Sequence, residues 1–178
     1  MEGHTEREGA LYAMLKQVLC THMVTQRIAY HQALAACVPA LGFQLWLMRE
    51  TQDEVPALID HAVATLHAEQ RAHTQMSLPA FAHYQASAED PPARALATTL
   101  VTLLRDSVVE HHLSVTATWR AFVPFFAEVL AIARLDAGGQ QWDIDGFIEG
   151  LREQLPPWID YWESWAGQGH DAGQEEPR

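Results

Sequence analysis

The segment W158-I-D-Y-W-E-S-W165 decides the fold class, because its aromatic residues recur at the spacing of one helical face. Trp158, Tyr161, Trp162 and Trp165 occupy positions i, i+3, i+4 and i+7, which lie on one side of a helix with about 3.6 residues per turn. Neither this segment nor any other shows the alternation with a period of two that indicates a strand. The pattern predicts an all-α protein with no sheet, folded as a single-domain helical bundle of about five to seven helices.

Outward from this segment, capping residues, prolines and glycines divide the chain into further helices. Thr5 and Glu8 have the spacing of a capping box, and Gly138-Gly139 marks a flexible joint. We expect five helices, at residues Thr5 to Cys37, Ala40 to Arg49, Thr51 or Asp53 to Met76, Asp90 to Val115, and Thr118 to Leu135. A short segment from Ser77 to Tyr84 separates the third from the fourth. A last helix begins at Asp145 and is interrupted at Pro156-Pro157. Residues 1–166 form the expected bundle domain, and residues 167–178 form a flexible acidic tail.

Acidic residues outnumber basic ones by 23 to 11, which gives the 178-residue chain a formal net charge of −12 at pH 7. Such a charge repels phosphate backbones, so we expect no nucleic-acid partner. Residues 28–48 contain no Asp, Glu, Lys or Arg, which raises the question of a membrane span. Because Pro39 and Gly42 lie in the middle of this stretch, we expect a buried helix, a turn and a second helix, and no membrane partner.

The two cysteines, Cys20 and Cys37, fall on the same expected helix. Seventeen residues along a continuous helix correspond to roughly 25 Å, whereas a disulfide needs Cα atoms within about 7 Å. We therefore predict two reduced thiols. Together with a polar, acidic N-terminus that does not resemble a signal peptide, this favours a cytoplasmic location.

Three histidines and one glutamate fall on apolar helix faces, where an ionisable group is costly unless it is paired or bound to a metal. His22 lies on the expected first helix, Glu69 and His73 lie one turn apart on the third, and His111 lies on the fourth. Neutral imidazoles and carboxylates from several helices suit a transition metal. The first hypothesis is therefore that these four residues converge on non-haem iron, zinc or a haem, with redox or oxygen chemistry as the function.

No sequence motif identifies a reaction, so the sequence leaves open whether the chain is an enzyme. It contains no His-Glu-x-x-His, no paired Cys-x-x-Cys, no Glu-x-x-His at an inward position and no nucleophile signature. Inward histidines are also satisfied by hydrogen bonds to other core groups. The second hypothesis is a cofactor-free regulatory or accessory module that binds a protein partner or a small apolar molecule; a homodimer is compatible with it.

The aromatic stripe and the other histidines allow two interpretations each. We expect the stripe of residues 158–165 to close the core, and a docking surface is the alternative. His61 and His67 point away from the apolar face of their expected helix, and His112 lies at the margin of the next one. We expect solvent contact for these three.

Overall fold

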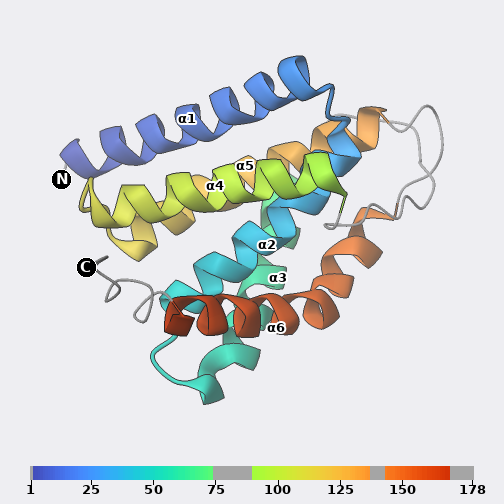
Figure 1. Ribbon diagram of the computed structural model, residues 1–178. Coiled ribbons are helices and arrows are strands. Elements are labelled where there is room, and N and C mark those ends of the chain that lie inside the picture. Colours follow the sequence, from blue (N-terminus) through green and yellow to red (C-terminus); the bar gives the residue numbers. More distant parts are fainter. Residues whose placement is uncertain (1, 74–89, 137–142, 169–178) are drawn as a thin grey trace, which may run out of the picture.

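The computed structural model describes residues 2–73, 90–136 and 143–168 (Figure 1). In chain order its elements are α1 (Glu2–Gln26), α2 (Tyr30–Met48), the 3-10 helix η1 (Gln52–Glu54), α3 (Val55–His73), α4 (Pro91–Val109), α5 (Val115–Asp136) and α6 (Ile144–Gln168). These residues contain six α-helices and no strand. The predicted all-α helical bundle is confirmed.

Helix α2 is the centre of the bundle, and every one of its residues from 33 to 45 is buried. It packs against α4, α5 and α6, while α1 packs on α5 and α4, and α3 packs on α6 and α5. Figure 1 shows α2 crossing from the group of α1, α4 and α5 toward α6. A helix without charged side chains can be buried on all sides because no ion has to leave water.

The first expected helix is two helices in the structure, so the prediction of one helix from Thr5 to Cys37 is wrong. The chain breaks between α1 and α2, where Arg27 adopts a left-handed φ of 54° and Ala29 is extended. The side chain of Gln32 accepts a hydrogen bond from the Ala29 amide at 3.0 Å, which caps the start of α2. Neither glycine nor proline marks this break. Cys20 is exposed on α1, Cys37 is buried in α2, and both are free thiols.

Pro39 and Gly42 do not form the expected turn but lie inside α2, where α6 crosses it. A Cβ atom on Gly42 would lie 2.7 Å from the Cβ of Trp158. The Nε1 of Trp162 donates a hydrogen bond to the carbonyl oxygen of Pro39 at 2.9 Å. Proline and glycine weaken an isolated helix. Here the absence of a Cβ atom on Gly42 allows α6 to pack closely, and Trp162 of α6 binds the carbonyl oxygen of Pro39.

The boundary between α4 and α5 also differs from the expectation. Helix α4 ends at Val109 instead of Val115, and His112 beyond it has a φ of 53°. Helix α5 begins at Val115, capped by the Ser114 hydroxyl, which accepts a hydrogen bond from the Ala117 amide at 3.1 Å. Thr118, the expected cap, is fully buried inside α5.

Helix α6 starts after Asp143, whose side chain accepts a hydrogen bond from the Gly146 amide at 2.8 Å. It continues through Pro156 and Pro157, so the expected interruption is a change of direction within one helix (Figure 1). Gly167 and Gln168 belong to α6 instead of the expected tail. The rest of that tail, residues 74–76 of the third expected helix, the segment from 77 to 84 and the joint at 138–139 lie outside the described residues.

Among the described residues, the stretch Val115–Ala133 of α5 is long and apolar enough to cross a membrane, and 61% of it is buried in the bundle. A core helix of a soluble protein meets the same criterion.

Candidate functional site

The four residues of the predicted metal site occupy different environments. His22 on α1 is half-buried, and its Nε2 lies 3.1 Å from the hydroxyl of Thr99 on α4. Its Nδ1 is buried and has no hydrogen-bond partner among the described residues. Glu69 on α3 is also half-buried. His73 is the last residue of α3, and its side chain lies outside the described part of the structure.

His111 does not lie on the apolar face of α4. Because α4 ends at Val109, His111 follows the C-terminal cap residue, Glu110, and is exposed. The prediction placed it inward by continuing the helical period to Val115. Once the helix stops, that period no longer specifies the direction of the side chain.

The described residues hold no group of three or more His, Cys, Asp and Glu side chains placed to bind a metal ion. The helices that carry His22 and Glu69 are also not a major packing pair, since α1 packs on α4 and α5 whereas α3 packs on α5 and α6. The structure thus brings His22 to Thr99 and shows no contact between His22 and Glu69 among these residues.

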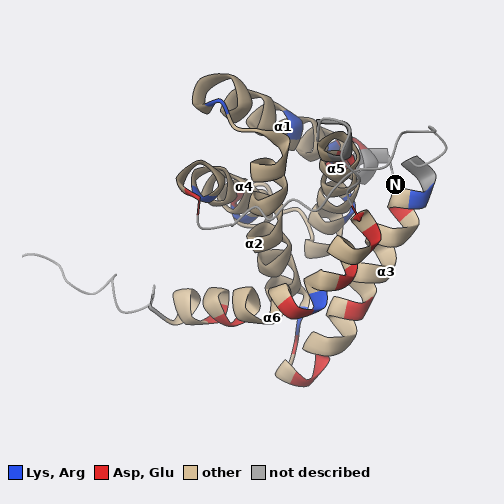
Figure 2. Cartoon of the chain, turned by 90° about the vertical axis from the view of Figure 1, so that its right-hand side faces the viewer, with Lys and Arg blue, Asp and Glu red and all other residues tan. Residues whose placement is uncertain are grey.

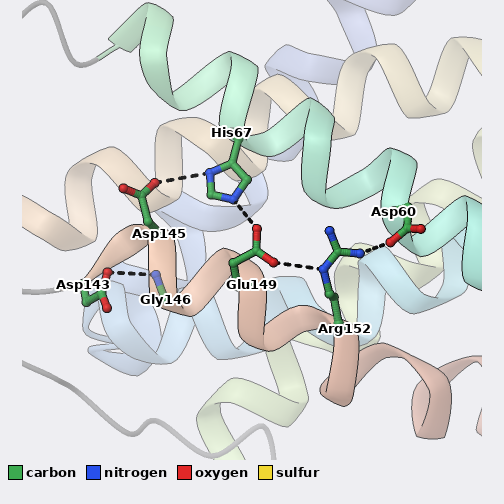
Figure 3. Close-up of polar contacts among 7 residues, drawn as sticks. All are labelled: Asp60, His67, Asp143, Asp145, Gly146, Glu149 and Arg152. Carbon is green, nitrogen blue, oxygen red and sulfur yellow. Dashed lines mark hydrogen bonds and ion pairs between the residues drawn. The ribbon is translucent and has the colours of Figure 1, made fainter.

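A polar cluster that the sequence did not indicate joins α3 to α6 (Figure 3). The Nε2 of His67 lies 2.9 Å from Glu149 Oε1, and its Nδ1 lies 3.2 Å from Asp145 Oδ1. Arg152 extends the cluster by contacting Glu149 at 2.9 Å and Asp60 on α3. One signal was available, because Asp145 and Glu149 are four residues apart and share one face of α6.

This cluster joins two helices. Each ring nitrogen of His67 faces a different carboxylate of α6. His67 is therefore less exposed than expected: its side chain is 18% exposed and clamps α3 to α6.

A second polar contact holds α1 on α5. The Tyr12 hydroxyl donates a hydrogen bond to Glu128, and Lys16 pairs with the same carboxylate at 2.7 Å. Partial burial, followed by the hydrogen bond and the negative charge of Glu128, raises the pKa of Tyr12 to about 12. The phenol therefore stays protonated at neutral pH and acts as a donor between the helices.

Two polar side chains are fully buried between α2 and α5. Thr118 Oγ1 donates to Gln44 Oε1 at 3.1 Å and also lies 2.8 Å from the carbonyl oxygen of Val115. The Nε2 of Gln44 is buried without a partner among the described residues. This contact favours one position of α5 along α2, because a shift would remove the donor from the buried Gln44 Oε1.

The aromatic stripe on α6 is divided between the core and the surface. Trp162 is 8% exposed and packs edge-on against Phe43 of α2, with ring centroids 5.4 Å apart. Tyr161 and Trp165 are 50% and 43% exposed, and each ring contacts Trp162 edge-on. We call Tyr161 and Trp165 the exposed aromatic pair. Residues four apart are neighbours on a helix surface, so the pair forms one patch.

The segment of α6 that carries this pair is held firmly on α2. Arg49, just after α2, pairs with Glu163 at 2.8 Å, and Gln52 of η1 donates to the same carboxylate at 2.6 Å. The Arg49 side chain is only 11% exposed. With Trp162 bonded to Pro39, three contacts from two elements fix this turn of α6, so the exposed aromatic pair is presented on a rigid support.

No known protein family matches the chain, and no curated protein or solved structure shows significant similarity to it.

Proposed function

We propose that this protein is a helical accessory or regulatory module that binds a protein partner through the exposed aromatic pair. The observation that carries the proposal is the exposure of Tyr161 and Trp165 beside a fully engaged Trp162. Half-exposed tyrosine and tryptophan are enriched in protein interfaces because they offer a large contact area with few side-chain rotations to restrict.

The rigidity of the site supports the same function. Glu163 is held by Arg49 and Gln52, and Trp162 is held by the Pro39 carbonyl, so the two exposed rings need little reordering when a partner binds. Less ordering lowers the entropic cost of association.

A photo-cross-linking amino acid at position 161, introduced in cells that make the protein, tests this function. We expect one discrete protein adduct that is absent when the same group replaces Asp145 at the far end of α6. The purified partner should then bind the native protein at least tenfold more tightly than Tyr161→Ala/Trp165→Ala. Absence of an adduct, or unchanged binding by the double variant, contradicts the proposal.

The second candidate function is the binding of a metal or haem. Its ligands would be His22, Glu69, His73 and His111. The observation that favours it is the buried Nδ1 of His22, which has no hydrogen-bond partner in the described part of the chain. Element analysis of untagged protein tests it: we expect stoichiometric metal that His22→Ala removes. Less than about a tenth of an equivalent, with no uptake from added iron or zinc, contradicts it.

A further inference from the structure

The exposed aromatic pair lies on a part of α6 that carries negative charges only. From residue 153 to residue 168 the helix contains Glu153, Asp160 and Glu163, and no Lys or Arg. Helix α3 also carries acidic residues, which are coloured red in Figure 2. Glu163 is paired with Arg49, whereas Asp160, directly before Tyr161, is exposed and has no ion pair within the described part of the chain.

The end of α6 adds to this negative field. The last turn contains no basic residue, so α6 itself supplies no cation next to the partial negative charge at its C-terminus. Trp165 lies in that turn. Electron-rich rings and an unpaired carboxylate thus occupy exposed positions of the same short stretch of α6, with Asp160 directly before Tyr161 in the sequence.

We propose that the partner segment that covers this surface is cationic, an inference that rests on the proposed function. Arg or Lys side chains of that segment stack on Tyr161 and Trp165 and pair with Asp160. Indole and phenol rings attract a cation within about 6 Å of the ring centroid, and arginine stacks on them especially well. The carboxylate and the helix end act in the same direction.

Charge disfavours the other occupants of this surface. A second copy of the chain would bring a net charge of −12 toward an equal charge, and an anionic lipid surface would be repelled likewise. A neutral apolar ligand would gain nothing from Asp160 or from the helix end.

Two synthetic peptides test the charge preference directly. An acetylated nine-residue peptide of alternating glycine and arginine is titrated into the full chain, and the tryptophan indole N–H signals are followed by NMR. A peptide with glutamate in place of arginine is the reference. We expect the arginine peptide to bind with the largest shift at Trp165, and the glutamate peptide to cause no shift at the same concentration.

Matched variants separate the site from general attraction to an acidic protein. Tyr161→Leu/Trp165→Leu keeps apolar side chains but removes both rings, and it should raise the Kd for the arginine peptide about tenfold. Asp160→Asn should also weaken binding, whereas Asp145→Asn makes the same charge change roughly 20 Å away and should not. Circular dichroism checks that each variant is folded.

Three results overturn the inference: the leucine variant binds the arginine peptide as well as the native protein, the two asparagine variants behave alike, or the glutamate peptide binds equally well. The proposed function is tested separately by the cross-linked adduct. If a partner is captured through position 161 and its contact segment is neutral or acidic, the function stands and the cationic preference fails. If no partner is captured, the function itself fails.

Discussion

Helices α2 and α6 pack against each other, yet they differ in how much of their surface is buried. Helix α2 contains no charged residue and is buried on every side from 33 to 45. Helix α6 buries only one face, and its other faces carry the clamp on His67 and the exposed aromatic pair. A residue change in α2 therefore affects the stability of the whole bundle, whereas most changes in α6 affect one surface.

The largest expected effect tests where the aromatic stripe divides. Trp162→Ala removes a buried ring and its hydrogen bond to Pro39, and it should lower the free energy of unfolding by about 3–5 kcal/mol. Trp165→Ala, three residues away, removes a ring that is 43% exposed and should cost less than about 1 kcal/mol. Urea denaturation of both variants measures the difference. Equal losses would mean that the stripe is one continuous part of the core.

A pair of glycine substitutions tests the helix crossing. Gly42→Ala places a Cβ atom 2.7 Å from Trp158, so we expect about 1–3 kcal/mol of overpacking, reduced by about 1 kcal/mol of helix propensity. Gly150→Ala meets only the Gln154 amide at 3.5 Å and should stabilise α6 by about 0.5–1 kcal/mol. Thermal melts of both variants should move in opposite directions. A shift of Gly42→Ala to higher temperature would show that the crossing is loose.

Alkaline pH should act on α2 through Cys37. Burial raises the pKa of the Cys37 thiol well above its ordinary value of about 8.5, so the unfolded chain loses this proton first. Stability is therefore fully present below about pH 8.5 and falls as the pH rises, by up to about 1.4 kcal/mol per unit. Tyr12 adds a second decline between its ordinary pKa of about 10 and its raised value of about 12.

Denaturation at pH 7 to 10 measures this effect. Cys37→Ala should remove the decline between about pH 8.5 and 10, although it lowers stability at pH 7. Cys20→Ala changes an exposed thiol and should leave the pH profile unaltered. A decline that persists in Cys37→Ala would assign it to another group.

The smallest expected effect concerns the clamp on the outer side of α6. Glu149→Gln weakens the contacts to His67 and Arg152, and because the Glu149 side chain is 53% exposed we expect a loss of about 0.3–1 kcal/mol. A double-mutant cycle with His67→Gln measures the coupling, and it should shrink in high salt. A coupling above about 2 kcal/mol would place the clamp among the interactions that hold the bundle together.

The helical class and most of the core followed from periodicity, because apolar spacing is a local property of the chain. Leu15 of α1 and Leu100 of α4, which lie on the apolar faces of their helices, are fully buried. The break at Arg27 could not be predicted, since no glycine or proline marks it and the Gln32 side chain caps the next helix. At Pro39 the sequence predicted a turn where the helix continues, because the hydrogen bond that stabilises α2 there comes from Trp162 of α6.

The candidate sites depended on information that periodicity does not contain. His111 was placed inward by assuming six more residues of helix, and the cap at Ser114 begins a new helix instead. His67 was assigned to solvent because it lies off the apolar face of α3, but a second helix covers that side with Asp145 and Glu149. Which residues meet across two helices is decided by tertiary packing.

The central position of α2 also has a consequence for synthesis of the chain on the ribosome. Pro39 and its hydrogen-bond partner Trp162 are separated by 123 residues, and translation at about 5–20 residues per second takes roughly 6–25 seconds to cover that distance. During this interval the apolar surface of α2 that α6 will cover is open to the surrounding medium. Until the last helix emerges, this surface makes the nascent chain prone to aggregation.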